Sequence, residues 1–295
     1  MSELVVVAGA TGYVGRHVVA ELDARGYRVR ALVRSREKAD APGAYDAPAL
    51  RDRVAEWRIV DFGDPATLTD ACAGADRVVS ALGVTRQKVS PWNIDFLGNL
   101  LVLADAEQHR LRSFAYVNVM RSEAGNSVTM RSKFAFSQAL RRSTVTPQII
   151  NPSGYFSDMT DFLRMAQRGI GFTLADGATR INPIHGADLA AFIVDRLDGP
   201  AGSWDVGGPD VFSYRELEQL AFRVAGKRPR ILRVGEGSVT ASSGWRSARR
   251  RGPPTSRGSS SSPWRSTPSE RRSASAALSP TGPRSPDIAR GRRTA

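Results

Sequence analysis

The sequence predicts an α/β protein, a Rossmann-type doubly wound parallel sheet with a small C-terminal lobe. Short β-type runs alternate with helical patterns up to residue 152, the first run ends in a glycine-rich turn, and the alternation loosens further along the chain. Such alternation is typical of a parallel sheet with helices on both faces. We therefore expect a Rossmann domain at 1–152, a smaller lobe interleaved with it at 153–237, and a tail at 238–295.

The strands expected in the first domain are short apolar runs that end at polar or glycine residues. The first run covers residues 4–9, and a helix from about Val14 to Arg25 follows it. Gly26 comes directly after this helix, where glycine commonly ends a helix because it adopts a left-handed backbone without strain. The remaining expected elements are strands at 28–34, 57–61, 77–83, 114–120 and 147–152 and a helix at 133–143.

The segment between the fourth and fifth strands has the apolar spacing of a helix. Over residues 93–108, Ile94, Leu97, Leu101 and Ala104 recur at intervals of three or four. Side chains at that spacing lie on one side of an α-helix. We therefore expect these four residues to form an apolar stripe.

The lobe is expected to consist of helices and short strands beside the carboxyl ends of the sheet. Residues 181–197 contain Asp188 followed by Leu189, Phe192 and Ile193, which together indicate a capped amphipathic helix. The other segments expected in the lobe are 154–169, 203–210 and 213–227.

The formal net charge of +13 is concentrated at the C-terminal end. Residues 241–295 contain twelve arginines against two acidic residues, Glu270 and Asp287, which leaves a net charge of only +3 for residues 1–240. A strongly basic balance often signals a nucleic-acid or anionic membrane partner. Here that signal belongs to the tail and not to the domain.

The tail has the composition of a segment that cannot form a core. Residues 241–295 include 14 serines and 7 prolines, no lysine, and only Leu278 and Ile288 as branched aliphatic residues. Such a segment buries too little apolar surface to offset the entropy of the chain, so we expect disorder. The composition favours a GC-rich coding region translated out of frame, and the alternatives are a native linker and an arginine-serine tail that binds nucleic acid.

Composition also restricts the classes of site. Cys72 is the single cysteine, and His17, His109 and His185 are far apart without a metal-ligand spacing, so we expect no disulfide framework and no bound metal. The sequence contains no apolar run long enough to span a membrane and no secretory signal. We expect a cytoplasmic monomer or homodimer that acts on a small molecule and has no nucleic-acid partner.

The glycine-rich turn after the first strand predicts a dinucleotide site. Three glycines spaced by two residues lie between a predicted strand and a predicted helix, the context that gives this motif meaning. Glycine allows the backbone to approach a pyrophosphate, and the helix N-terminus presents unpaired N–H groups to it. A hydroxyl and an aromatic wall are supplied by two residues within the turn. The residues expected to bind here are Gly9, Thr11, Gly12, Tyr13, Val14 and Gly15.

The end of the second strand indicates which cofactor binds. NAD sites usually place an acidic residue here for the ribose 2′-hydroxyl, whereas a 2′-phosphate requires a cation. This chain has Arg34, Ser35, Arg36 and Lys38 and no acid at the strand end. NADP(H) is therefore predicted in preference to NAD(H), the alternative being a solvated basic loop.

A further contact is expected at the end of the third strand. Asp61, with Phe62 beside it, is placed to meet the adenine. The alternative for Asp61 is a helix cap for the turn that follows.

Several segments resemble the atypical short-chain dehydrogenase/reductases, in particular the NmrA-like, isoflavone-reductase-like and divinyl chlorophyllide vinyl reductase-like proteins. The resemblance covers about residues 1–235 and is strong because the order and spacing of the motifs agree. The motifs are GATGYVG at 9–15, SALGVTRQK at 80–88, NIDFLGN at 93–99, NPSGYFSDM at 151–159, INPIHGADLA at 181–190 and VGGPD at 206–210.

The resemblance implies roles for residues that the pattern alone does not assign. It places a loop after the fourth strand against the cofactor and the end of the sixth strand at the nicotinamide. The residues so implied are Ala81, Leu82 and Gly83 in the first segment and Pro152, Gly154 and Tyr155 in the second.

The catalytic pair of the wider superfamily is incomplete in this chain. A Tyr-x-x-x-Lys motif usually carries out acid–base chemistry, and Lys133 matches the lysine, but Thr129 stands at the tyrosine position. A threonine hydroxyl is too weak an acid to replace a phenol. The usual serine at the end of the fifth strand is replaced by Asn118 or Val119. The resemblance therefore assigns Lys133 to the cofactor ribose and makes it a candidate proton donor, with an ordinary surface lysine as the alternative.

These departures leave two classes of function. The first is an NADP(H)-dependent reductase that acts on an activated C=C or C=O bond of an apolar small molecule. The second is a non-catalytic NADP-binding regulator or assembly factor of the NmrA-like type. Tyr155 and His185 are further candidate proton donors. The residues expected to line the substrate site are Tyr155, Phe156, Met159, Phe162, Ile184 and His185.

Overall fold

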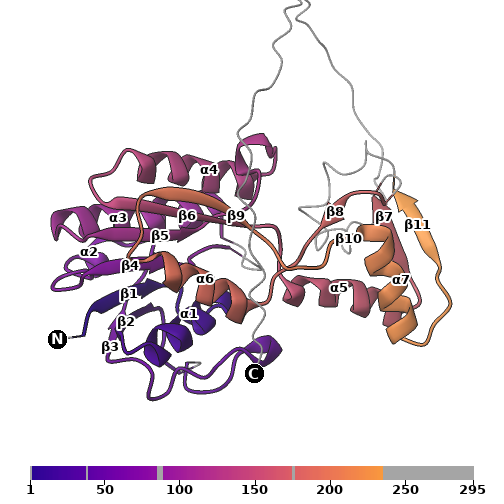
Figure 1. Ribbon diagram of the computed structural model, residues 1–295, viewed down its shortest axis with the longest axis horizontal. Coiled ribbons are helices and arrows are strands. Elements are labelled where there is room, and N and C mark those ends of the chain that lie inside the picture. The colour runs from indigo at the N-terminus through magenta and orange to yellow at the C-terminus, as the bar shows by residue number, and fades with distance from the viewer. Residues whose placement is uncertain (1, 38, 85–88, 175–176, 235–295) are drawn as a thin grey trace, which may run out of the picture. The chain divides into compact units, whose positions relative to one another are not determined.

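The computed structural model describes residues 2–37, 39–84, 89–174 and 177–234. The predicted α/β class is confirmed by a seven-stranded sheet of the order β3-β2-β1-β4-β5-β6-β9, in which every pair is parallel (Figure 1). The strand order reverses between β1 and β4, where open α/β sheets bind ligands. The strands are β1 (Leu4–Ala8), β2 (Arg28–Val33), β3 (Glu56–Ile59), β4 (Arg77–Ser80), β5 (Ser113–Val117), β6 (Thr146–Pro152) and β9 (Gly202–Val206).

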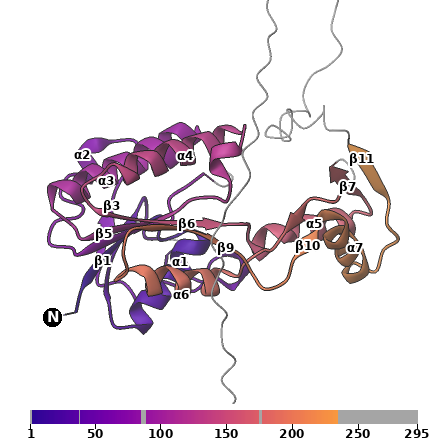
Figure 2. The ribbon, with the colours of Figure 1, turned by 45° about the horizontal axis from the view of Figure 1, so that its top comes forward.

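Helices cover both faces of the sheet, which explains why β1 is apolar at every position. Its side chains alternate: Val5 and Val7 lie in one core cluster, and Val6 and Ala8 in the other. Helices α1 and α6 cover the first face, and α2, α3 and α4 cover the second (Figure 2). The helices are α1 (Tyr13–Ala24), α2 (Pro65–Leu68), α3 (Asn99–Gln108), α4 (Val128–Arg141) and α6 (Gly186–Arg196).

Two elements that the sequence analysis assigns to the lobe pack with the first domain, β9 as a strand of the main sheet and α6 as a helix on one of its faces. Strand β9 pairs with β6, and α6 packs against α1. The reason is apolar burial, because Leu189 and Ile193 of α6 complete the core beneath α1. The N-cap of α6 is also different: His185 Nδ1 accepts the backbone N–H of Ala187 at 3.2 Å, while Asp188 lies in the first turn.

The stripe predicted over residues 93–108 is only half correct. The chain first forms a π-helical turn, η2 (Trp92–Gly98), and then α3. Because a π-turn holds more residues than an α-turn, an apolar spacing of three or four does not stay on one side through both segments. Ile94 and Leu101 pack against the core, whereas Leu97 and Ala104 are exposed. The fully buried apolar residues of α3 are Val102, Leu103 and Ala106.

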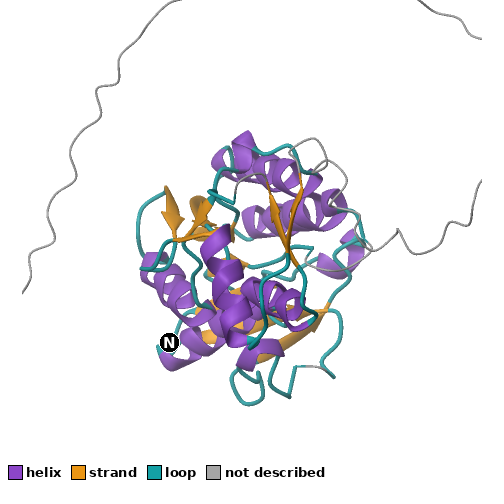
Figure 3. Cartoon of the chain, turned by 90° about the vertical axis from the view of Figure 1, so that its right-hand side faces the viewer, coloured by secondary structure: helices purple, strands orange, loops and turns teal. Residues whose placement is uncertain are grey.

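The lobe contains two packed helices and two short strand pairs (Figure 3). The predicted boundaries at 152 and 237 stay predictions. By internal contacts the chain divides into Met1–Arg246 and Ser247–Ala295, and the predicted tail lies outside the described residues. No helix among the residues described here is long and apolar enough to cross a membrane. The lobe elements are α5 (Phe156–Gln167), α7 (Tyr214–Val224), β7 (Gly171–Leu174), β8 (Arg180–Ile181), β10 (Phe212–Ser213) and β11 (Ile231–Val234), and short helical turns occur at η1 (Ala44–Asp46) and η3 (Ser122–Ala124).

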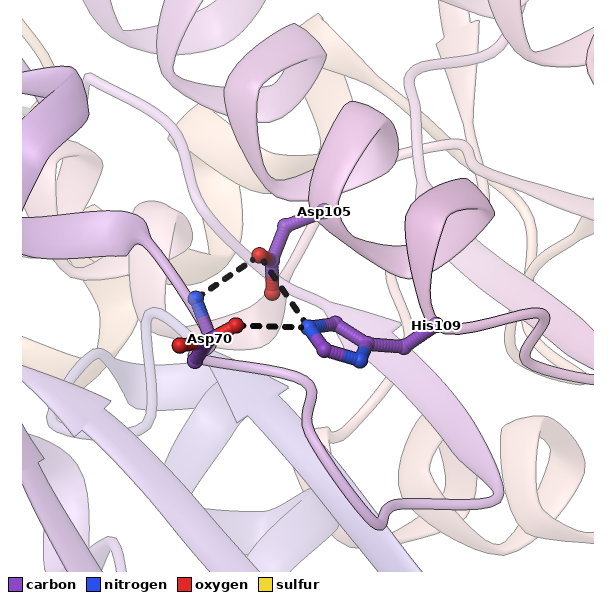
Figure 4. Close-up of side chains that lie close together, drawn as sticks. All are labelled: Asp70, Asp105 and His109. Carbon is purple, nitrogen blue, oxygen red and sulfur yellow. Dashed lines mark hydrogen bonds and ion pairs between the residues drawn. The ribbon is translucent and has the colours of Figure 1, made fainter.

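A buried carboxylate on α3 holds the loop before β4 (Figure 4). The oxygens of Asp105 accept the backbone N–H groups of Asp70 at 2.9 Å and Cys72 at 2.6 Å, and His109 Nε2 lies 3.1 Å from Asp70 Oδ1. Burial raises the pKa of the Cys72 thiol, and the charge of Asp105 adds to the rise. The side-chain ligand atoms of Asp70, Asp105 and His109 lie within 4.8 Å of one another, but the Asp105 carboxylate is already engaged by the backbone. We interpret this cluster as a structural bracket.

Replacing Asp105 by asparagine is expected to destabilise the fold. An amide has one accepting oxygen, so one buried N–H group loses its partner, at a cost of about 1–3 kcal/mol in the free energy of unfolding. Urea denaturation measures this loss. Asp70→Asn is the matched control, because the Asp70 side chain is 58% exposed and its pair with His109 contributes about 0.5 kcal/mol or less. Equal losses in the two variants would contradict the interpretation that the Asp105 carboxylate stabilises the loop before β4.

Candidate functional site

A cavity of about 560 Å³ opens at the carboxyl ends of β1, β2 and β4. This is the reversal point of the strand order, and the volume lies within the usual range of small-molecule sites. Most of the residues that the sequence analysis selects line this one cavity. They are Gly9, Thr11, Gly12, Tyr13, Val14, Arg34, Asp61, Phe62, Ala81, Leu82, Gly83, Lys133 and Tyr155.

The glycine turn is shaped by two close backbone approaches. Gly9 has a φ of +76°, and a Cβ there would lie 2.8 Å from the carbonyl oxygen of Ala81. A Cβ on Gly15 would collide with the Gly9 carbonyl oxygen. Gly12 is less restricted, because its φ is −73° and its Cβ would lie 3.3 Å from the same oxygen. Gly15 thus serves packing behind the cavity, while Gly9 and Gly12 line it.

The N-terminus of α1 faces this cavity with its backbone donors available. The N-cap residue, Gly12, provides no side-chain hydrogen bond, and the first turn contains no acidic residue. The first N–H groups of a helix have no partner within the helix, and together with the helix dipole they favour an anion. The residues present therefore fit the pyrophosphate of a dinucleotide.

Of the basic residues described at the end of β2, Arg34 lines the cavity and is exposed, whereas Arg36 is not in the lining. Ser35 lies outside the lining, and its Oγ accepts the N–H of Glu37 at 3.3 Å. The Arg36 guanidinium lies over the Trp57 ring, 5.0 Å from the centroid. Lys38 falls outside the described residues.

The two interpretations of Asp61 are separated by its neighbour Asp64. Asp64 is the N-cap of α2 and accepts the N–H of Ala66 at 3.0 Å, so Asp61 is not needed as that cap. Asp61 Oδ1 accepts the N–H of Gly63 at 2.9 Å, and Asp61 lines the cavity with the buried Phe62. Its contact with adenine stays a prediction.

Lys133 lines the cavity from the middle of α4. Its Nζ lies 3.1 Å from Asp95 Oδ1, donates to the Val117 carbonyl at 3.2 Å, and lies over the Tyr116 ring at 5.2 Å from the centroid. The lysine side chain is 14% exposed and Asp95 is fully buried. Lys133 is thus a cavity residue held in one position, which excludes the alternative of an ordinary surface lysine.

Tyr155 brings a phenol to the same cavity from the N-cap position of α5. Burial raises the pKa of Tyr155 to about 12, and the positive charge of Lys133 acts in the opposite direction. Ile184 supports the tyrosine from behind, since the two residues form a β-bridge and the Phe156 N–H donates to the Ile184 carbonyl at 3.2 Å. The phenol therefore stays protonated at neutral pH.

The positions that usually carry catalytic hydroxyls do not reach the cavity. Thr129 lies in the first turn of α4 and outside the cavity lining. Asn118 is buried and donates to Ser122 Oγ at 3.0 Å and to Asn151 Oδ1 at 2.8 Å. The cavity thus contains a lysine and a tyrosine, but from two different elements.

His185 lies in an aromatic cluster outside the cavity lining. Its ring is 5.2 Å from that of His17, and burial lowers the pKa of His17, with a smaller contribution from His185. Tyr13 belongs to this cluster and also lines the cavity. Its hydroxyl accepts the N–H of Gly186 at 3.1 Å. His185 is occupied as the cap of α6. A catalytic role for His185 stays a prediction without support from this geometry.

The other residues predicted for the substrate site are divided between two places. Phe156, Met159 and Phe162 line a separate apolar groove of about 220 Å³ between α5 and α7. Ile184 is buried behind Tyr155. Pro152 and Gly154 lie outside the cavity lining and form the backbone that leads to Tyr155. Their proposed contacts with ligands stay predictions.

The structure also adds residues that the sequence analysis missed. The most consequential is Asp95, because a buried acid within an apolar helical pattern is not identifiable from spacing. Its only signal was its place inside the NIDFLGN motif. Asp95 itself lies outside the cavity lining, and the lining residues that were missed are Leu32, Val33, Gly63, Val84, Val89, Asn93, Ile94, Val117, Ser157 and Asp158.

The fold and the glycine-lined cavity define a dinucleotide-binding α/β protein. Residues 9–200 match the family of NAD(P)H-binding proteins. The chain belongs to this family, which lies among the atypical short-chain dehydrogenase/reductases.

Relatives of known name include both reductases and an assembly factor. The chain is 27% identical to divinyl chlorophyllide a 8-vinyl-reductase of Zea mays over 78% of this chain and 61% of the relative. It is 26% identical to ceramide reductase of Caulobacter vibrioides, over 81% and 76%. It is 24% identical to a photosystem II assembly factor of Cyanophora paradoxa, over 78% and 71%. The chain thus spans about three-fifths of the length of the plant reductase that it matches.

A solved structure supports the fold. The NADPH-dependent quinone oxidoreductase of Escherichia coli superimposes with a TM-score of 0.64 and 20% identity, covering 81% of this chain and 83% of the oxidoreductase. At this level of identity the likeness establishes a shared architecture.

The second and third glycines of the turn, Gly12 and Gly15, are expected to respond differently to alanine. Gly15→Ala places a methyl group against the Gly9 carbonyl and should lower the free energy of unfolding by about 1–3 kcal/mol. Gly12→Ala should leave stability within about 1 kcal/mol but weaken NADPH binding about tenfold or more, because its methyl group projects where the pyrophosphate must approach. Thermal unfolding and fluorescence titration measure the two quantities.

The reverse pattern would contradict this division of roles. If Gly15→Ala bound NADPH normally at full stability, the backbone approach at Gly9 would not constrain the turn. If Gly12→Ala bound NADPH with unchanged affinity, the pyrophosphate would not lie at the N-terminus of α1.

Proposed function

We propose that this protein is an NADPH-dependent reductase that transfers hydride to an activated C=C or C=O bond of an apolar small molecule. One observation carries the proposal: Lys133 and Tyr155 line the same cavity as the glycine turn. A cofactor site and an ammonium–phenol pair are the parts that such a reaction needs. The names of two relatives, which denote reductases of divinyl chlorophyllide and of ceramide, support this chemistry.

In this proposal the protein holds the cofactor and supplies a proton. The bound nicotinamide supplies the hydride. Lys133 donates hydrogen bonds to the ribose, with Val117 and Asp95 keeping its ammonium in place. Tyr155 donates the proton, because burial keeps its phenol neutral and Lys133 favours the phenolate that remains after transfer.

NADPH is the proposed cofactor because of the charge at the end of β2. Arg34 lines the cavity and is exposed, so its guanidinium is available to a 2′-phosphate. The first described residue after Val33 that carries a negative charge is Glu37, which lies outside the lining. A carboxylate near the ribose would favour NADH instead.

The substrate is proposed to be apolar because several aliphatic side chains line the cavity. Val84, Val89, Ile94 and Val117 are among them. Such a surface favours a ligand that buries hydrocarbon.

A second candidate is an NADP-binding regulator or assembly factor without catalysis. Thr129 replaces the usual tyrosine, and one relative is named as a photosystem II assembly factor. NADPH oxidation with a panel of enones, quinones and vinyl tetrapyrroles distinguishes the two candidates. Turnover supports the reductase, and tight binding without turnover supports the regulator.

Removing the phenol of Tyr155 is expected to slow turnover. General acid catalysis typically contributes about 10²–10⁴-fold, so kcat of Tyr155→Phe should fall by about 10²-fold or more. NADPH affinity should change less than about threefold, because the ring that lines the cavity is retained. Tyr27→Phe is the control, since Tyr27 lies outside the cavity lining. A Tyr155→Phe variant with full turnover would exclude Tyr155 as the proton donor.

Removing the cation at position 34 is expected to weaken NADPH selectively. Arg34→Ala loses a charge-assisted hydrogen bond of about 1.5–3 kcal/mol, which corresponds to roughly 10–100-fold in Kd for NADPH. The Kd for NADH should stay within about twofold. Arg36→Ala is the matched control, because Arg36 lies over Trp57 and not in the cavity lining. An equal effect of Arg34→Ala on both cofactors would overturn the 2′-phosphate assignment.

A further inference from the structure

A fully buried carboxylate lies beside Lys133, just outside the cavity lining. Asp95 belongs to the π-helical turn η2 and has no exposed surface. Its Oδ2 accepts the Val84 N–H at 3.0 Å, and its Oδ1 lies 3.1 Å from Lys133 Nζ. An isolated buried charge is strongly unfavourable, so carboxylate and ammonium depend on each other.

The contacts of Lys133 leave part of its hydrogen-bonding capacity for the cavity. A lysine ammonium has three hydrogens. One is donated to the Val117 carbonyl at 3.2 Å, and Asp95 Oδ1 lies 3.1 Å from the Nζ atom as the partner of an ion pair. The Tyr116 ring covers a further side of the group at 5.2 Å from the centroid. Because Lys133 also lines the cavity, a further hydrogen of the ammonium is available to a ligand.

Gly83 lies against both the Asp95–Lys133 pair and the cavity. A Cβ at Gly83 would lie 2.9 Å from Asp95 Oδ1 and 3.2 Å from Lys133 Nζ, and Gly83 itself lines the cavity. The missing side chain therefore leaves the ammonium uncovered on the side of the ligand.

We infer that Asp95 is a positioning residue, whose buried carboxylate fixes the Lys133 ammonium at the gap left by Gly83 so that one hydrogen of the ammonium points to the bound dinucleotide. This inference rests on the proposed contact between Lys133 and the cofactor. The competing explanation is purely structural, in which Asp95 only holds the Val84 backbone. The two explanations differ in whether the effect of Asp95 passes through Lys133.

A double-mutant cycle on cofactor binding tests this dependence. The variants are Asp95→Asn, which keeps an oxygen for the Val84 N–H, Lys133→Met, which keeps the aliphatic stem, and the double variant. Fluorescence titration measures the Kd for NADPH. We expect each single substitution to weaken NADPH binding about tenfold. The double variant should bind NADPH about as well as the single variant that has the lower affinity. If Asp95→Asn raises the Kd for NADPH by the same factor in the Lys133→Met background as in the wild type, Asp95 does not act through Lys133 and the inference is overturned.

Thermal unfolding of the protein without cofactor gives a second, independent readout. Each single substitution leaves one buried charge without its partner and should lower Tm, whereas the double variant contains neither charge and should recover most of the loss. Asp105→Asn is the matched control, because Asp105 is also buried and accepts backbone N–H groups but lies outside the cavity lining. Its effect on Tm should add to that of Lys133→Met.

The outcomes separate this inference from the proposed reductase. Unchanged NADPH binding in both single variants, with lower Tm, would make the pair structural and overturn the inference. A chain that binds NADPH with the expected coupling but reduces nothing in the substrate panel would retain the inference and lose the reductase. A single variant that does not fold leaves the double variant to be compared with the wild type, and a Kd equal to that of the wild type would overturn the inference.

Discussion

The architecture depends on a steric constraint where two strands end side by side. β1 and β4 are neighbours, so the backbone of the turn after β1 runs very close to the backbone that leaves β4. Gly9 permits this, since any side chain there would meet the backbone of Ala81 and Leu82. The same approach brings the N-terminus of α1 and residues 81–83 to one cavity. The dinucleotide site is thus a consequence of how closely two backbones pack.

Most strands of the sheet and the glycine turn could be predicted from the sequence because both depend on local signals. Apolar runs and glycine spacing identify strands and a turn whatever the rest of the chain does. The packing positions of β9 and α6 and the burial of Asp95 could not be predicted in the same way. The place of β9 beside β6 and the burial of Asp95 depend on partners more than thirty residues away, Gln148 and Lys133 among them. The π-turn also changed the phase of the apolar stripe, which no propensity indicates.

The proposed chemistry joins groups from elements that the usual motif would place on one helix. Lys133 comes from α4 and Tyr155 from the start of α5, and Thr129 lies outside the cavity lining. A Tyr-x-x-x-Lys pair keeps its spacing through one helical turn. Here the distance between phenol and ammonium depends on how α5 is attached to Ile184. Movements of the lobe would therefore change the acid–base pair directly.

The bracket around Asp105 has a practical value beyond stability. Cys72 is the single cysteine of the chain, it is buried, and its backbone N–H is held by Asp105. Burial raises the pKa of its thiol, so the native side chain contains little of the thiolate that reacts with alkylating reagents. Its rate of labelling therefore reports the opening of this face of the sheet. A cysteine introduced on the surface would carry a fluorophore with little competition from Cys72.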